Sequence, residues 1–206
     1  MPVTYDPLDT YPTPEHVLQQ MYRTYARARS YADIGVVTST DDTSSADRSF
    51  RTDFVRPQLR FDITDDGPPT TYLVWSDGKA AVTRNADKLE TTSVEVALRD
   101  AKDASYSASR WIPTLLTGVD GRVPLTRLEL VGKKRIAGHD CWEIIGYDDV
   151  GGGYRLDVDK HSHLLVRVLH ASTYGFGDEL KVAEVIRYEP VIDDPEVEVD
   201  PIAVEP

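Results

Sequence analysis

Three consecutive glycines, Gly151 to Gly153, separate two runs of residues that alternate apolar and polar. The run before them is DCWEIIGYDD and the run after them begins YRLDVD. A phosphate-binding loop needs a helix directly after its glycines, because the N–H groups at the helix N-terminus hold the anion. Both runs instead have the two-residue period of a strand with one buried face. The glycines therefore favour a β-hairpin, in which positive φ angles cost them nothing, over a nucleotide site.

The same two-residue period recurs along most of the chain and predicts eight to ten strands. Short polar turns separate the segments, among them DDGPP at 65–69 and DG at 77–78. Sequential strands with short connections form an antiparallel meander, and a sheet of this size curls. Its concave apolar face must then be covered. The segments lie at 34–40, 48–57, 58–64, 70–76, 79–84, 126–138, 140–147, 154–159, 163–172 and 179–190.

Two segments have a helical period and are the cover that the sequence offers. Thr13 as N-cap and Pro14 at the first helical position predict a helix over residues 15–30, with one apolar stripe. Thr92 and Glu95 have the spacing of a capping box and predict a second helix over residues 92–102.

A third apolar segment, RWIPTLLTG at 110–118, contains Pro113. A proline inside so short a segment argues against a regular helix across it. We expect one or two helical turns or a lid, with Trp111 at the mouth of a cavity and the polar KDASYSAS before it as a tether.

The charge balance limits the classes of partner. The formal net charge is −12 and the basic residues are scattered, which argues against nucleic acid or an anionic membrane surface as the main partner. The densest basic run, KKR at 133–135, is interpreted as the solvated face of a hairpin. No segment approaches the roughly 18 apolar residues of a membrane span. The first residues lack the pattern of a secretory signal.

Candidate catalytic and metal-binding residues are few. Cys141 is the single cysteine, so no intrachain disulfide forms, and its place in a strand favours a buried, inert thiol. His161 and His163 share a strand face and could both bind a metal, but two ligands at a turn are too few to specify a site. No GxSxG or HExxH motif occurs. The sequence therefore predicts no metal, no cofactor and no enzyme.

In strand order and motifs the chain resembles the LolA-like superfamily of lipoprotein carriers, which includes LolA-, RseB- and LppX-like proteins. The resemblance runs from about Tyr22 to Tyr188. It rests on ARSYADIGVVTST, FVRPQLRFDI, LVWSDGKAAV, WIPTLLTG and YRLDVDKHSHLLVRV in that order. It implies a half-open β-barrel whose concave side, partly plugged by helices, receives acyl chains or a partner's hydrophobic segment. It also implies an extracytoplasmic or envelope location, while the lack of a signal peptide leaves the cytoplasm open.

Together these features predict an α+β fold, with a large curved antiparallel sheet, a long N-terminal helix and a short helical insert over the concave face. Residues 1–190 are expected to form one domain, and residues 191–206 an acidic tail or an edge strand. The leading hypothesis is non-catalytic binding of a lipid, a lipoprotein acyl chain or another apolar ligand. An RseB-like sensor domain for a protein partner is the alternative, and a hydrolytic enzyme the third. The expected ligand-binding residues are Phe54, Phe61, Tyr72, Trp111, Leu115, Leu116, Trp142, Tyr154 and Leu156.

Overall fold

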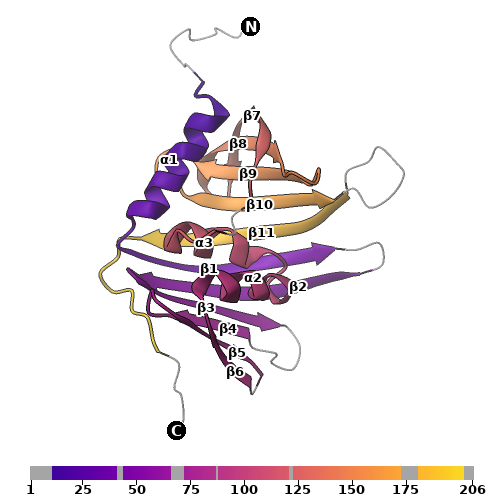
Figure 1. Cartoon of the computed structure of the whole chain (residues 1–206). Coiled ribbons are helices and arrows are strands. Elements are labelled where there is room, and N and C mark those ends of the chain that lie inside the picture. The colour runs from indigo at the N-terminus through magenta and orange to yellow at the C-terminus, as the bar shows by residue number, and fades with distance from the viewer. Residues whose placement is uncertain are drawn as a thin grey trace, which may run out of the picture.

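A computed structural model of the chain contains one antiparallel sheet of 11 strands, with the α-helices of the described residues on one face (Figure 1). The structure describes residues 11–40, 44–65, 72–86, 88–120, 123–172 and 181–201. The predicted α+β class and the curved, unclosed antiparallel sheet are confirmed. Most of the predicted turn at 65–69 lies outside the described residues.

The sheet consists of two meanders that meet at its centre. The order is β6-β5-β4-β3-β2-β1-β11-β10-β9-β8-β7, so β1 pairs with β11 and the strands at the two ends, β6 and β7, do not pair with each other. The first meander comprises β1 (Ser30–Thr40), β2 (Ser45–Val55), β3 (Gln58–Asp65), β4 (Tyr72–Ser76), β5 (Ala81–Asn85) and β6 (Lys88–Thr92). The second comprises β7 (Thr126–Ile136), β8 (His139–Tyr147), β9 (Gly153–Asp159), β10 (Leu165–Ser172) and β11 (Lys181–Ile192).

The glycine-rich hairpin is confirmed, since β8 ends at Tyr147 and β9 begins at Gly153. Gly151 has φ +91°, and the Asp148 carboxylate accepts hydrogen bonds from Val150 N and Gly152 N. The turn is thus held by its own side chain. No helix begins at the glycines, which is the feature that phosphate binding would require.

Helix α1 (Pro14–Arg27) begins as predicted, with His16 N donating to Thr13 Oγ1 at 3.2 Å. It buries an apolar stripe that includes Met21 and Tyr25. The helix ends before residue 30 because Ser30 already pairs with β2.

One expectation about the other helices is wrong, and one is confirmed in part. Helix α2 (Val94–Ala104) is capped by Ser93, not Thr92, because Thr92 is still paired in β6. Residues 112–117 form α3 (Ile112–Thr117) after the 3-10 turn η1 (Ala108–Arg110), and its six residues are the expected one or two helical turns, but the helix is regular despite Pro113. Pro113 does not prevent it, because proline lies in the first turn, where its missing N–H has no helical acceptor.

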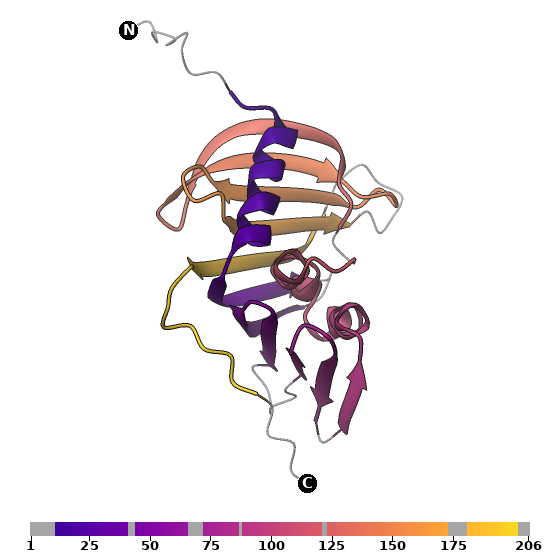
Figure 2. The same cartoon turned by 60° about the vertical axis from the view of Figure 1, so that its left-hand side comes forward.

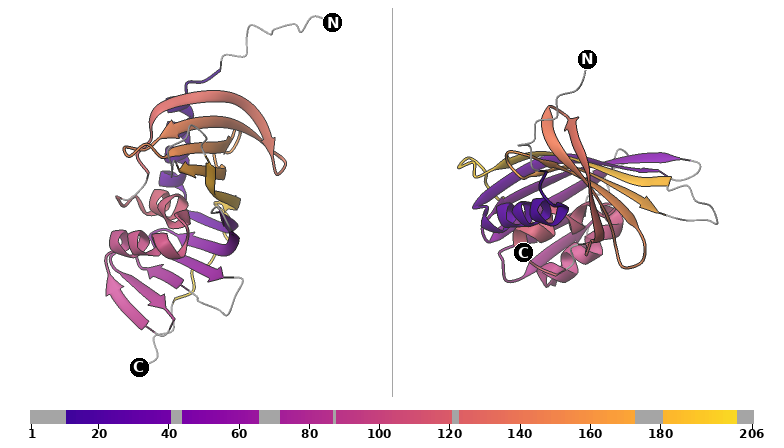
Figure 3. Two further views of the ribbon diagram at one scale, coloured as in Figure 1. Left: turned by 90° about the vertical axis from the view of Figure 1, so that its right-hand side faces the viewer. Right: turned by 90° about the horizontal axis from the view of Figure 1, so that it is seen from above.

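The helices cover different parts of the sheet. Helix α1 runs across the strands of the second meander and contacts β7 and α3, whereas α2 contacts β4 and β5, and α3 contacts β3 (Figure 2). Seen from the side, strands β7 to β10 form a curved arch, and helices α2 and α3 lie below this arch (Figure 3). All three helices therefore contribute to one core between themselves and the concave face.

Gly35 lies at a tight point of that core, and replacing it by alanine is expected to destabilise the protein by about 3 kcal/mol. Gly35 lies in β1 between Phe50 and Tyr188 on the neighbouring strands. An added methyl group would overlap the Phe50 ring and lie 2.6 Å from the Arg187 carbonyl oxygen, which is backbone and cannot turn away. Urea denaturation measures the loss.

Gly146→Ala is the matched control on the same face of the sheet. There the nearest atom to an added methyl group is Leu128 Cδ2, the movable end of a side chain, at 2.9 Å. We expect a clearly smaller loss than at Gly35. Equal losses at the two positions would contradict the tight packing around Phe50.

Candidate functional site: the concave face

The predicted ligand-binding residues of the strands share the concave face of the sheet. Phe54 is the cross-strand partner of Leu59, which alternates with Phe61 in β3. In the second meander Leu156 pairs with Ile144, and Trp142 pairs with Val158. The strands between the two groups continue the same face through Val37, Ile186 and Val168. The side assignment made from alternation is therefore correct.

Most of these residues are covered by the helices. Eight of the nine predicted ligand-binding residues belong to the buried core, and Trp142 is half-buried against it. The exposed fraction is 9% for Tyr72, the largest of the eight. In this structure their contacts are with other side chains of the core. The buried eight are Phe54, Phe61, Tyr72, Trp111, Leu115, Leu116, Tyr154 and Leu156.

Trp111 lies in the core. The lid interpretation had placed it at the mouth of a cavity, and the structure does not show it there. Its side chain is 3% exposed, and its ring meets that of Tyr154 edge-on with 5.6 Å between the centroids. Tyr154 in turn stacks on His170 at 4.5 Å. The indole Nε1 is buried and has no hydrogen-bond acceptor among the described residues. A buried N–H group without an acceptor destabilises the packing of the helices that cover the sheet.

A buried carboxylate, which sequence reasoning did not identify as notable, lies in the middle of the concave face. Asp33 is 3% exposed and accepts hydrogen bonds from Tyr31 Oη at 2.8 Å and Thr52 N at 3.0 Å. Burial raises the pKa of Asp33 to about 7, although these hydrogen bonds oppose the shift. Its inward position in the alternating run Tyr31, Asp33, Gly35 was readable from the sequence.

Three tyrosines surround this carboxylate from three elements. Tyr25 of α1 accepts a hydrogen bond from Leu165 N at 3.0 Å and fastens the helix to β10. Burial is the main cause that raises the pKa of Tyr31 and of Tyr188 well above the ordinary value. The Tyr188 hydroxyl has no hydrogen-bond partner within the described part of the chain. The cluster is therefore a polar centre inside an apolar core.

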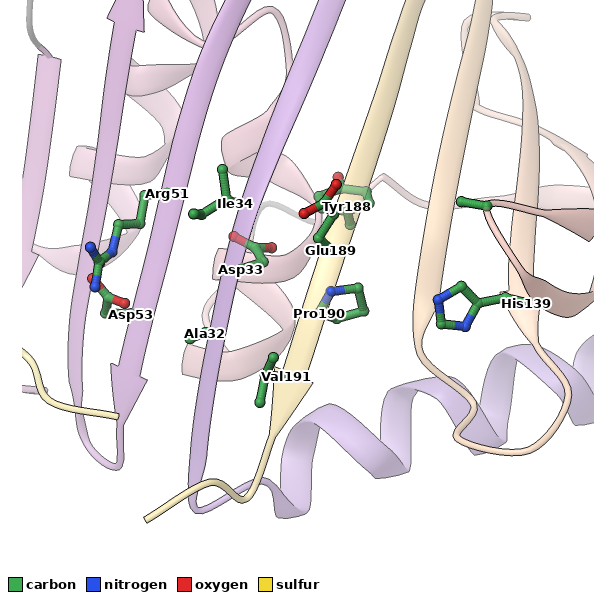
Figure 4. Close-up of a pocket in the computed structure, with 11 residues that line it drawn as sticks. Ala32, Asp33, Ile34, Arg51, Asp53, His139, Tyr188, Glu189, Pro190 and Val191 are labelled. Atoms are coloured by element: carbon green, nitrogen blue, oxygen red, sulfur yellow. The ribbon is translucent and has the colours of Figure 1, made fainter. Parts of the chain in front are cut away.

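Three cavities lie largely outside the helix-covered core. One cavity is a groove of about 580 Å³ on the outer face of the sheet (Figure 4). It is lined by residues of β1, β2, β11 and the β7–β8 turn, including Ile34, Arg51, His139 and Val191. A polar cavity of about 610 Å³ lies between α2 and β4 to β6, and Tyr72 is among its lining residues. A smaller one, of about 190 Å³, is lined in part by Tyr154. Of the nine predicted residues, Tyr72 and Tyr154 thus border these cavities.

The surroundings of the candidate metal-binding histidines and of Cys141 indicate structural roles for these residues. Asp159 Oδ1 accepts hydrogen bonds from the backbone of His161 and Ser162, and Asp159 Oδ2 lies 3.1 Å from His139 Nδ1. No group of three or more metal-ligating side chains of His, Cys, Asp or Glu occurs within the described residues. Cys141 is buried, and burial raises the pKa of its thiol to about 12. That shift opposes formation of the reactive thiolate.

The helices in the described ranges also answer the question of a membrane span. None of them combines the length and the apolar character that crossing a bilayer requires.

Comparison with known proteins finds similarity of structure. No family model and no curated protein matches the sequence. An uncharacterized conserved protein from Thermus thermophilus has a TM-score of 0.52 at 10% identity, over 86% of each chain. The complex of Pseudomonas aeruginosa MucA and MucB gives a TM-score of 0.51 at 14% identity, over 88% of this chain. Mycobacterium tuberculosis lipoprotein LppX gives 0.49 at 18% identity, over 90% of this chain and 97% of LppX.

The chain spans 57% of the matched chain in the MucA/MucB complex, so that protein extends well beyond the shared part. Identities of 10% and 14% establish a common fold and nothing finer. The present chain thus shares the fold of these two structures, a curved antiparallel sheet with helices on its concave face, which is the fold that the LolA-like resemblance implied.

Proposed function

We propose that this protein is a non-catalytic carrier that binds a lipid, a lipoprotein acyl chain or another apolar ligand between its sheet and its helices. The observation that carries the proposal is the concave face itself, which is apolar in both meanders and covered by separate short helices. Helix α3 has six residues and α2 has 11. Helices of this length are marginal by themselves, so their cover depends on contact with the sheet.

An apolar ligand would replace these contacts, and no empty cavity is needed beforehand. Each buried methylene contributes about 0.8 kcal/mol, so a chain of roughly ten methylenes offsets a substantial part of the cost of moving α2, η1 and α3. The cover includes the unpartnered indole N–H of Trp111, which lowers the cost of displacing it. The nine predicted residues would then line the bound chain. The proposed carrier needs no cofactor and catalyses no reaction. We propose that it acts outside the cytoplasm.

The test begins with mass spectrometry of organic extracts of the purified protein. We expect co-purified lipid, or, after its removal, saturable binding of a fluorescent fatty acid. Binding should increase amide hydrogen exchange in residues 94–117, which form the cover, and leave β8 and β9 protected. A protein that yields no lipid and binds no fatty acid would refute the carrier proposal. Binding without any change in residues 94–117 would place the ligand elsewhere.

A protein partner is the second candidate, and one comparison favours it. MucB, whose fold this chain shares, has been crystallised with MucA. The filled state of the concave face also fits a protein that takes a hydrophobic segment of a partner in place of a lipid. Absence of lipid binding together with capture of a defined apolar peptide would select this alternative.

A further inference from the structure

Four segments of the chain bring two aromatic rings and two lysines together where α1 begins. Tyr11 precedes α1, Lys133 belongs to β7, Trp142 to β8, and Lys160 follows β9. The ring centroids of Tyr11 and Trp142 are 5.6 Å apart. Lys133 Nζ lies 5.0 Å from the Tyr11 ring centroid and 5.4 Å from that of Trp142, and Lys160 Nζ lies 4.9 Å from that of Trp142. We call these four side chains the aromatic–lysine patch.

The backbone fixes this arrangement. Lys133 and Trp142 are cross-strand partners in the β7–β8 pair. Lys160 N donates a hydrogen bond to Asp140 O at 2.8 Å, which holds the β9–β10 turn beside the start of β8. Tyr11 is 52% exposed and Trp142 is half-buried, so both rings reach the surface. The patch is therefore built from ordered elements and presents aromatic and cationic groups together.

Asp159 and Glu143, two acidic residues of the strands that carry the patch, contact other groups. Asp159 Oδ1 accepts two hydrogen bonds from the backbone of the turn that follows it. Glu143 Oε1 lies 3.3 Å from Lys134 Nζ and 3.3 Å from Arg155 Nη1, on the other face of the sheet from Trp142. Within a chain of net charge −12, the patch thus brings two lysines together on two aromatic rings.

We propose that the aromatic–lysine patch docks this protein on an anionic lipid surface. Tyrosine and tryptophan favour the headgroup region of a bilayer, because their rings are apolar at one end and polar at the other. Lysines near the surface are attracted by anionic headgroups. A specific protein interface buries about 800 Å² on each partner, contributed by roughly 20 residues or more, which four side chains do not provide.

The negative net charge weakens this docking but does not oppose it at close range. At about 0.15 M salt the Debye length is about 8 Å, so carboxylates farther than that from the bilayer are largely screened. Lys133 and Lys160 lie on the Trp142 ring and therefore come close to a surface that this ring enters. Docking is consequently expected to need anionic lipid.

The location connects docking with the concave face. Trp142 lies on that face, in β8 beside the last strand of the sheet, β7. Helix α1 begins at this edge of the sheet (Figure 2). A bilayer at the patch would therefore lie against the rim of the helix-covered core. Docking does not require the proposed carrier function, because a protein can adsorb to a membrane without holding a ligand. The two are measured separately, one by vesicle flotation and the other by lipid extraction.

The test compares wild type with Lys133→Gln/Lys160→Gln and with Lys79→Gln/Lys102→Gln, a double variant of the same net charge at exposed sites elsewhere. Vesicles of phosphatidylcholine alone and of phosphatidylcholine mixed with phosphatidylglycerol are floated with each protein. Wild type and the control should float with the anionic vesicles, and the patch variant about 30-fold less. Lys133→Arg/Lys160→Arg should retain binding, which separates loss of charge from loss of structure.

Fluorescence quenching by brominated lipid gives the second readout. Trp142→Phe should lose most of the quenching by anionic brominated vesicles, since Trp111 is in the core and Trp75 lies in β4 of the other meander, away from the patch. The proposal is overturned if wild type ignores anionic vesicles or binds neutral ones equally well. It is also overturned if the patch variant binds like wild type, or if soluble polyglutamate competes fully, which would indicate an acidic protein partner.

Discussion

Trp111→Ala is expected to destabilise the protein by about 3–5 kcal/mol, the usual cost of removing a buried tryptophan ring. The side chain is 3% exposed and packs on Tyr154 between η1 and α3. Its loss would leave a cavity between the helical cover and β9, where the surrounding strands are held by their ladders and cannot collapse into it. Equilibrium urea unfolding followed by circular dichroism measures the change.

Trp142→Ala is the control with the same change of side chain. Trp142 is half-buried at the edge of the same face, so its removal should cost clearly less. Trp111→Phe should recover most of the stability, because it restores an aromatic ring and removes the unpartnered N–H. If Trp111→Ala unfolds at the wild-type urea concentration, residue 111 is not core in solution, and the lid interpretation from the sequence would stand.

The difference between the predicted lid and the observed core has a physical origin. The sequence shows that residues 110–118 are apolar and contain Pro113, but the effect of proline depends on where the helix begins. A proline one position into a helix favours it, and the same proline in the middle would break it. That starting position is set by contacts of Trp111 and η1 with the core, which alternation does not reveal.

Other elements were predictable because their patterns are local. The β8–β9 hairpin follows from alternation on both sides of Gly151 to Gly153, and the start of α1 follows from Thr13 and Pro14. Strand β6 was missed, since residues 88–91 are exposed and show no alternation of burial. Its pairing with β5 is decided by hydrogen bonds at the sheet edge, not by a buried face.

Only part of the polar centre of the core could be predicted from the sequence. Alternation places Asp33 inward beside Tyr31, but its other neighbours come from distant parts of the chain. Tyr188 reaches it from β11 and Tyr25 from α1, and neither proximity can be inferred from one sequence. Long-range register across β1 and β11 creates the site.

Asp33 should make the stability of this protein fall as the pH rises from about 4 to about 7. The pKa of Asp33 is about 7 in the fold, against an ordinary value of 3.8. A pKa raised on folding means that the folded state favours the protonated form. Its stabilising contribution is complete below pH 3.8, declines between the two values and is absent above pH 7. The difference corresponds to about 4 kcal/mol.

The groups that face Asp33 explain the direction of the shift. They are Tyr31 in its own strand, Tyr25 of α1, Tyr188 of β11 and, from β2, Thr52 and the nearby Asp53. None of them carries a positive charge, and Asp53 is itself acidic. Two hydrogen bonds stabilise the carboxylate, but they are too few to offset its burial.

Asp33→Asn separates this effect from the titration of all other groups. Unfolding free energies of wild type and variant are measured in urea between pH 4 and pH 8, and their difference is plotted. The variant should gain about 4 kcal/mol relative to wild type across this range, because an amide has no charge to bury. Asp47→Asn, on an exposed position of the same strand pair, serves as the matched control for the change of side chain. A pH-independent difference for Asp33→Asn would show that Asp33 is solvated or paired in solution, and that the polar centre does not destabilise the core at neutral pH.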